Sequence, residues 1–267
     1  MTRMQGSISF TLLIALAFAT PAFSRQKETG FLNRTVKVGS ASHRYQVYVP
    51  QGWTARKRWP VILFLHGAGE RGDDGLIQTE VGIGTAIRRH ADRAAAIVVF
   101  PQCLKNRWWP EPDMQKVAIA ALDRAMREFN GDPDRVYLTG ISMGGYGTWA
   151  LARSNPGRFA ALAPVCGGVI APGRVRLPEN SEVSSATDPY KDVAMKVGKT
   201  PVWVFHGAAD TVVPVSESRK MVEALKAGGG DVRYSEYEGV GHNSWDRAYA
   251  EAEFFTWLLE KNLKSQI

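Results

Sequence analysis

Apolar residues in this chain gather in short runs that are rich in β-branched and aromatic side chains, with polar or glycine-containing segments between them. Runs that are apolar on both sides of a strand are typical of strands buried on both faces of a sheet. We expect four such strands, at residues 61–65, 96–100, 135–139 and 201–205. A weaker run at 159–165 predicts a fifth.

Other segments alternate between apolar and polar residues, as strands do when one face is buried and the other meets solvent. Residues 34–38 and 44–49 alternate on either side of a turn-forming sequence at 39–42, which predicts an antiparallel β-hairpin near the N-terminus. Residues 231–237 alternate in the same way, and we expect them to form an edge strand.

Segments with helical spacing of apolar residues separate the later strands, at 115–129, 142–154, 215–227 and 247–261. Alternating strands and helices form a mostly parallel sheet, here of about eight strands with the hairpin at its N-terminal side, and helices on both faces. The sequence therefore predicts an α/β fold whose ligand site lies beyond the carboxyl ends of the strands. The irregular segment 167–199 is expected to be a loop or a small lid.

The N-terminus has the layout of a signal peptide, with a basic residue at Arg3, an apolar run at 10–19 and small residues near position 24. Cleavage before Arg25 or before Phe23 suits this layout, and the apolar run is too short to span a bilayer. We expect a signal peptide at 1–24, a linker at 25–33 and a single catalytic domain at 34–267. The protein is then secreted or periplasmic, without stable membrane insertion.

The formal net charge of +7 comes from Lys and Arg residues scattered along the chain, with no run longer than 56–58. A scattered excess favours solubility rather than a nucleic-acid partner. The sequence contains no Walker A loop, no His-Glu-x-x-His pair and no cysteine-rich cluster. We therefore expect neither a cofactor nor a metal.

Residues 140–144, Gly-Ile-Ser-Met-Gly, follow a predicted strand and open a predicted helix. A nucleophile elbow requires this context, because a tight turn exposes the Ser142 hydroxyl and the flanking glycines let the helix pass close to the strand. Unpaired N–H groups at the start of the helix suit an oxyanion beside Ser142. The structural alternative is a Ser N-cap in a glycine-rich connection.

A serine nucleophile needs a base, and the base needs an orienting acid; after a nucleophile elbow both follow the serine in the chain. Asp210 and His242 each come just after a predicted strand, so we nominate them as acid and base. Asp246 and Glu238 are alternatives for the acid, but neither follows an earlier strand.

One oxyanion-hole donor is expected from the loop after residues 61–65, whose glycines free its backbone N–H groups. We nominate the N–H of Ala68 together with that of Met143, and Gly69 is the alternative to Ala68. Residues 67–72 also match the dinucleotide fingerprint Gly-x-Gly-x-x-Gly. That match lacks its context, because no helix opens there and no acidic residue ends the next strand.

Other aromatic and imidazole side chains are expected near the carboxyl ends of the strands. Trp108 and Trp109 follow a predicted strand, and we nominate both as substrate-binding residues. Tyr146, on the helix after the elbow, is expected to be a core residue. His66 and His206 each precede a glycine at a strand end, and we expect both to be buried structural histidines.

Together these motifs resemble the α/β-hydrolase superfamily, in particular secreted esterases of the carboxylesterase, phospholipase and dienelactone-hydrolase-like group, including feruloyl and polyhydroxybutyrate-depolymerase-type esterases. The resemblance runs from about residue 43 to residue 259 and rests on the segments 66–72, 101–103, 108–109, 140–147, 206–210 and 241–242. It implies Ser142, Asp210 and His242 as a catalytic triad, a metal-free mechanism, and ester substrates that are small or carried on a polymer. Dienelactone hydrolases proper carry Cys as the nucleophile, so Ser142 argues against that activity.

The strand order implied by this resemblance also concerns Cys103 and Cys166, which follow strands separated by two others. At about 4.8 Å per strand, the ends of these strands lie about 14 Å apart. A disulfide requires Cα atoms within about 7 Å, so we expect free thiols, although an exported chain would permit a bridge.

The sequence thus predicts a serine esterase that forms an acyl-enzyme intermediate. Two alternatives stay open. A serine peptidase of the oligopeptidase-like type uses the same triad, but the chain has no room for the large gating domain of such relatives. A non-catalytic binding protein would keep the fold without the activity.

Overall fold

A computed structural model describes residues 28–170 and 187–266 of the chain, so the expected signal peptide at 1–24 lies outside the described residues. Within them, eight strands form one sheet, in the spatial order β1 (Gly30–Val38), β2 (Ala41–Val49), β4 (Ile97–Pro101), β3 (Trp59–Leu65), β5 (Gly131–Ile141), β6 (Ala161–Val165), β7 (Val202–Gly207) and β8 (Val232–Tyr237). The pairs β1–β2 and β2–β4 are antiparallel and the remaining pairs are parallel. This is the predicted α/β-hydrolase fold with its N-terminal hairpin.

Alternate residues of the central strands pack into two cores, one on each face of the sheet. In β3, Val61, Leu63 and Leu65 lie in one core, whereas Ile62 and Phe64 lie in the other, and all five are buried. This explains why the strands read as continuous apolar runs in the sequence.

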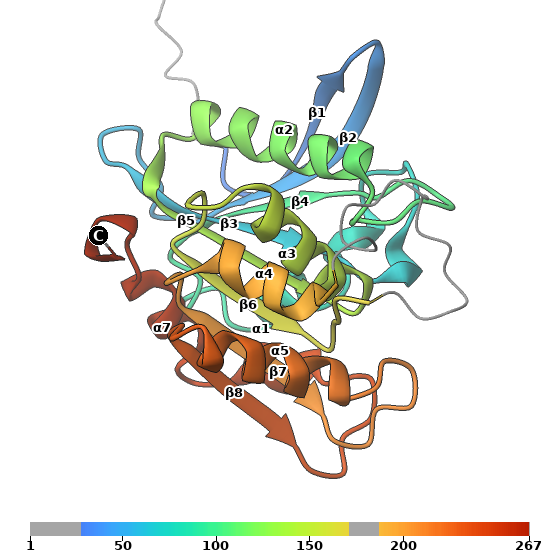
Figure 1. Cartoon of the computed structure of the whole chain (residues 1–267). Coiled ribbons are helices and arrows are strands. Elements are labelled where there is room, and N and C mark those ends of the chain that lie inside the picture. The colour runs from blue at the N-terminus through green and yellow to red at the C-terminus, as the bar shows by residue number, and fades with distance from the viewer. Residues whose placement is uncertain (1–27, 171–186, 267) are drawn as a thin grey trace, which may run out of the picture.

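Helices cover both faces of the sheet (Figure 1). One core includes residues of α2 (Pro112–Glu128), α3 (Met143–Ser154), α4 (Pro189–Val197) and α5 (Ser216–Ala227). The other includes residues of α1 (Ile83–Arg89), α6 (Trp245–Ala250) and α7 (Phe254–Glu260). Short 3-10 turns occur at η1 (Ala68–Glu70), η2 (Ile77–Thr79) and η4 (Leu263–Gln266). No helix among the described residues has both the length and the apolar character needed to cross a bilayer.

Several predicted boundaries differ from the structure. Strand β1 begins at Gly30 rather than at residue 34, so it takes up part of the expected linker. The helix expected at 247–261 is two helices, because the chain leaves the helical conformation at Glu251, where ψ is 127°. Helix α1 was not predicted from the sequence.

Helix α4 lies within the segment 167–199, which was expected to be a loop or lid, and residues 171–186 of that segment lie outside the described residues. The helix begins after Asp188, whose carboxylate accepts hydrogen bonds from the N–H groups of Tyr190 and Lys191. Pro189 follows at the first helical position. An Asp N-cap followed by Pro is a helix-start signal that the sequence carries.

Candidate active site

Ser142 occupies a strained turn between the end of β5 and the start of α3. Its φ of 52° and ψ of −115° are rare for any residue other than glycine. The turn brings α3 so close to β3 that a Cβ atom on Gly144 would lie 1.9 Å from the carbonyl oxygen of Leu65. A Cβ on Gly140 would lie 2.3 Å from the carbonyl oxygen of Gly144. The glycines of the motif are therefore required by backbone contacts.

The structure brings Ser142, His242 and Asp210 together in one line of hydrogen bonds. His242 Nε2 lies 2.8 Å from Ser142 Oγ, and His242 Nδ1 lies 2.7 Å from Asp210 Oδ2. Asp210 follows β7 and His242 follows β8, so parallel strands deliver both to the carboxyl edge of the sheet, where β5 delivers Ser142. Asp246 accepts a hydrogen bond from Asn243 instead.

The Asp210 carboxylate is fully buried and surrounded by donors. Its Oδ1 accepts hydrogen bonds from the N–H groups of Val212 and Val213, at 2.8 and 2.9 Å. Burial alone would raise the pKa of Asp210, but the hydrogen bonds from His206, His242 and these N–H groups hold it well below its ordinary value. Asp210 is therefore a permanent negative charge beside His242.

His206 is buried, as expected, and it also contacts the acid, which the sequence analysis missed. Its Nε2 lies 3.2 Å from Asp210 Oδ2 and 3.0 Å from the carbonyl oxygen of Val213, while its Nδ1 lies 2.7 Å from Ser218 Oγ. A neutral ring that accepts from the Ser218 hydroxyl and donates from Nε2 satisfies these contacts. His206 is thus a positioning residue for Asp210, four residues before it in the chain.

The two nominated oxyanion donors come from neighbouring backbone segments. Helix α3 starts against the end of β3, and Ala68 begins η1 three residues after that strand. The first hydrogen bonds of α3 run from the N–H groups of Gly145 and Tyr146 to the carbonyl oxygen of Ser142. The N–H of Met143 precedes both donors in the chain and takes no part in these bonds. This end of α3 also carries the positive end of the helix dipole.

His66 supports the loop that carries Ala68. Its Nδ1 lies 2.6 Å from the carbonyl oxygen of Gly67, and its Nε2 accepts a hydrogen bond from the N–H of Cys103 at 2.9 Å. Complete burial lowers the pKa of His66 to about 4, so the ring is neutral near pH 7. The expectation of a structural histidine is confirmed.

Trp109 is only 1% exposed, and its indole N–H donates to the carbonyl oxygen of His66 at 3.0 Å. It supports the same loop from the core, which corrects the expectation that it lines a substrate pocket. Trp108 is partly exposed and meets the ring of Tyr146 edge-on, with the centroids 5.9 Å apart. Tyr146 is buried, as expected, but its hydroxyl has no hydrogen-bond partner in the part of the chain that the structure describes.

Both cysteines are free and buried, which confirms the expectation of free thiols. Burial raises the pKa of each thiol to about 12. Among the described residues, Cys166, Asp210 and His242 form a group whose potential ligand atoms all lie within 4.8 Å of one another. A metal would require the thiolate of Cys166, which burial disfavours, and would compete with the hydrogen bond between His242 and Asp210. These donors fit a proton-transfer triad better than a metal centre.

The model of the dienelactone hydrolase family matches residues 88–253. The chain belongs to this family. Among solved structures, a thermostable esterase superposes with a TM-score of 0.72 at 34% identity, covering 87% of this chain and 63% of that chain. S-formylglutathione hydrolase from Staphylococcus aureus gives a TM-score of 0.67 at 17% identity, covering 86% of this chain and 96% of that one, and shows the shared fold.

Two curated relatives cover nearly the whole of this dienelactone hydrolase family member. One, from Arthroderma benhamiae, is named "Uncharacterized secreted protein" and is 28% identical over 264 residues, which span 90% of this chain and 27% of that protein. The other, from Aspergillus niger, is named "Probable feruloyl esterase C" and is 24% identical over 250 residues, or 91% of this chain and 84% of that protein. The chain therefore spans about a quarter of the Arthroderma relative.

Proposed function

We propose that this chain is a serine esterase that cleaves carboxylic esters through an acyl-enzyme, with Ser142 as nucleophile, His242 as base and Asp210 as orienting acid. The observation that carries this proposal is the hydrogen-bonded line from Ser142 Oγ to His242 Nε2 and from His242 Nδ1 to Asp210 Oδ2, at 2.8 and 2.7 Å. The esterases among its relatives and structural neighbours support the reaction class.

In the acylation step, Ser142 Oγ attacks the carbonyl carbon of the ester while His242 Nε2 takes the serine proton. The negative charge that develops on the carbonyl oxygen is stabilised by the backbone N–H groups of Ala68 and Met143. The bond to the alcohol oxygen then breaks, and His242 returns its proton to the departing alcohol. Asp210 stabilises the imidazolium throughout.

In the deacylation step, a water molecule takes the place of the alcohol. His242 takes a proton from the water as its oxygen attacks the acyl carbon, and the bond to Ser142 Oγ breaks. The proton passes from His242 to Ser142 Oγ, which restores the free enzyme and releases the acid. Trp108, beside the elbow helix, contacts the substrate in this scheme.

A fluorophosphonate probe and p-nitrophenyl acetate test the proposal together. We expect hydrolysis of the ester and covalent labelling at Ser142, with both lost in Ser142→Ala and kept in the matched variant Ser265→Ala. Labelling of another serine, or turnover by Ser142→Ala, would overturn the assignment. Matched aminoacyl amides and esters test the peptidase alternative, because faster cleavage of the amides would contradict an esterase.

We also propose that the protein is exported, with residues 1–24 removed as a signal peptide. The basic, apolar and small-residue layout of this segment supports export. The name of the Arthroderma relative, a secreted protein, agrees with it. N-terminal sequencing of the mature protein is expected to begin at Arg25 or Phe23, and an intact Met1 on the exported protein would contradict the proposal.

A further inference from the structure

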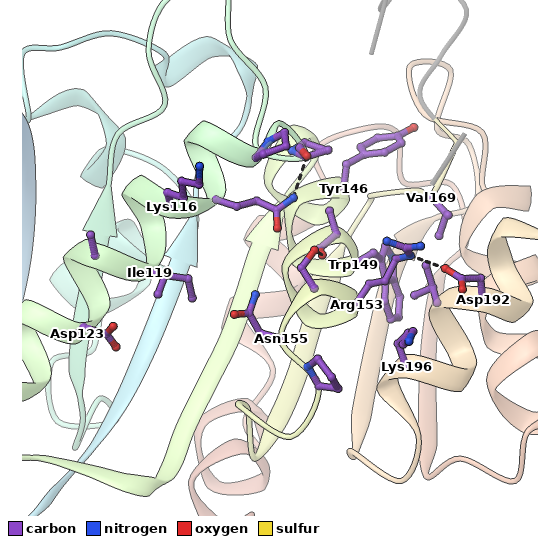
Figure 2. Close-up of a pocket in the computed structure, with 18 of the residues that line it drawn as sticks. Lys116, Ile119, Asp123, Tyr146, Trp149, Arg153, Asn155, Val169, Asp192 and Lys196 are labelled. Carbon is purple, nitrogen blue, oxygen red and sulfur yellow. Dashed lines mark hydrogen bonds and ion pairs between the residues drawn. The ribbon is translucent and has the colours of Figure 1, made fainter. Parts of the chain in front are cut away.

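A pocket of about 1070 Å³ lies on the face of the sheet that α2, α3 and α4 cover. Its lining runs along α3 from Tyr146 to Asn155, with α2 on one side and α4 on the other (Figure 2). Tyr146 lies one helical turn after Ser142, and its N–H donates to the carbonyl oxygen of Ser142 at 3.1 Å. Tyr146 therefore links the lining of the pocket to the first turn of the elbow helix, although Ser142, Asp210 and His242 do not themselves line it. The volume of the pocket matches a ligand larger than a short acyl group.

Tyr146 lines the pocket with a buried side chain. The residue is 3% exposed, and its hydroxyl has no hydrogen-bond partner among the described residues, although a buried hydroxyl normally finds one. Figure 2 shows Tyr146 at the end of the pocket opposite Asn155 and Lys196. A buried hydroxyl that the described residues leave unpaired, on a side chain that lines the pocket, is available to pair with a ligand.

Half of the residues that line the pocket, Tyr146 included, carry a polar or charged group that can bind the polar groups of a ligand. The side-chain amide of Gln115 donates to the carbonyl oxygen of Pro110 at 2.8 Å, and that of Asn155 donates to the carbonyl oxygen of Leu151 at 2.9 Å. Both amide oxygens are left as acceptors. Hydroxyl groups of a ligand are the complementary donors.

The charges around the pocket favour an anion. Its two carboxylates are already engaged by arginines, since Asp192 pairs with Arg153 and Asp123 pairs with Arg158. Three lysines also line the pocket, from three different elements: Lys37, Lys116 and Lys196. Lys116 lies 4.0 Å from Asp113, so the positive charge that nearby acids do not offset comes from Lys37 and Lys196. A concave surface with this excess attracts anionic ligands.

We propose that this pocket binds the non-reacting part of an acidic oligosaccharide ester, a hydroxyl-rich chain with carboxylate groups, and that Tyr146 is a specificity-determining residue near the start of α3. The inference rests on the proposed esterase function. The lysines bind the carboxylates, the amide oxygens accept from sugar hydroxyls, and the Tyr146 hydroxyl bonds to the sugar nearest the scissile ester.

Direct binding separates this proposal from the esterase function, because it needs no turnover. Trigalacturonic acid and the neutral trisaccharide xylotriose, titrated calorimetrically into the wild-type chain, compare an anionic and a neutral ligand of equal length. We expect trigalacturonic acid to bind more tightly, with an affinity that falls as salt is added. Equal affinity for the two sugars, or no binding of either, would overturn the proposal even if the protein is an esterase.

Charge variants locate the binding site. Replacing Lys37 and Lys196 by Gln is expected to weaken the binding of trigalacturonic acid about three- to tenfold, which is the size of effect that the loss of two exposed charge contacts produces. The control Lys226→Gln with Lys264→Gln lowers the net charge equally, away from the pocket, and is expected to keep the affinity. Equal losses in both double variants would show a diffuse charge effect and overturn the assignment to this pocket.

Tyr146→Phe tests the specificity residue with two measurements. The affinity for trigalacturonic acid is expected to fall about three- to tenfold, while the melting temperature does not fall, because the hydroxyl has no partner to lose among the described residues. The control Tyr234→Phe removes a hydroxyl that donates to Glu236 at 2.7 Å, and is expected to keep the affinity. A lower melting temperature with unchanged affinity in Tyr146→Phe would make the hydroxyl structural and overturn its role.

Discussion

Asp210 combines two features that a carboxylate rarely has at once, complete burial and a fixed negative charge. Four donors make this possible: two backbone N–H groups and the rings of His206 and His242. A charge held in this way keeps the His242 ring in one orientation, with its Nδ1 proton toward the acid and Nε2 free to accept from Ser142.

Asp210→Asn is expected to lower kcat by about 10⁴-fold, because the amide presents the wrong hydrogen-bond partner to His242. The loss is expected at every pH between about 5 and 9, since the depressed pKa of Asp210 keeps it ionised across that range. The measurement is kcat on p-nitrophenyl acetate over this range, with circular dichroism to verify the fold. The matched variant Asp246→Asn is expected to cost little, and the opposite result would make Asp246 the acid.

The two buried thiols give a second test. Cys103 and Cys166 are fully buried, and burial raises the pKa of each to about 12, so the reactive thiolate is scarce at neutral pH. We expect a thiol reagent such as Ellman's reagent to label neither in the native protein and both after denaturation without a reductant. Finding no thiol in the denatured protein would show a disulfide and contradict this structure.

The residues that the sequence analysis recovered were those fixed by local motifs, and those it misjudged depend on distant partners. Ser142 was evident from the strand, turn and helix around it. The contact of His206 with Asp210 and the pairing of Trp109 with the His66 carbonyl arise only when separate loops meet. Because the sequence does not show these contacts, it gave no reason to expect that Trp109 is buried and Trp108 is not.

Among the elements, the buried parallel strands were predictable because an apolar run on both faces has few other interpretations. The short helices could not be predicted in the same way. Helix α1 has seven residues and α6 has six, too few for a clear periodicity, and α4 was overlooked despite its Asp-Pro start. The break between α6 and α7 at Glu251 has no Gly or Pro to mark it.

The close packing of α3 against the end of β3 leaves no room for a side chain at Gly144. Gly144→Ala is expected to prevent stable folding or to unfold the elbow, because its Cβ would stand 1.9 Å from the Leu65 carbonyl oxygen and backbone would have to move. Soluble yield and melting temperature are the measurements. Gly52→Ala is the control, since no atom lies within 4 Å of its added Cβ, and similar losses in the two variants would contradict the packing argument.

Over the whole molecule, the residues proposed for catalysis lie at one end of the sheet, and a partly buried pair of hydrogen bonds from Tyr137 to the C-terminal segment lies nearer the other. Ser142, Asp210 and His242 all follow carboxyl ends of strands. Tyr137, nearer the start of β5, has its hydroxyl 2.9 Å from the Lys261 carbonyl oxygen and 3.2 Å from that of Leu259, which ties the C-terminal end of α7 to the central sheet. Stability and activity should therefore respond to different substitutions.

Two variants test this separation in opposite directions. Ser142→Gly is expected to abolish turnover while leaving the free energy of unfolding unchanged or higher, since relief of about 1–3 kcal/mol of backbone strain offsets the ~1 kcal/mol entropic cost of a glycine. Tyr137→Phe is expected to lower the free energy of unfolding by about 0.5–1.5 kcal/mol, because two partly buried carbonyl oxygens lose their donor, and to keep kcat/KM. Urea unfolding and p-nitrophenyl acetate hydrolysis measure the two quantities on the same preparations. If Tyr137→Phe lowered kcat/KM at temperatures where it stays folded, the two ends of the sheet would be coupled, and the carboxyl edge could not be treated as an independent site.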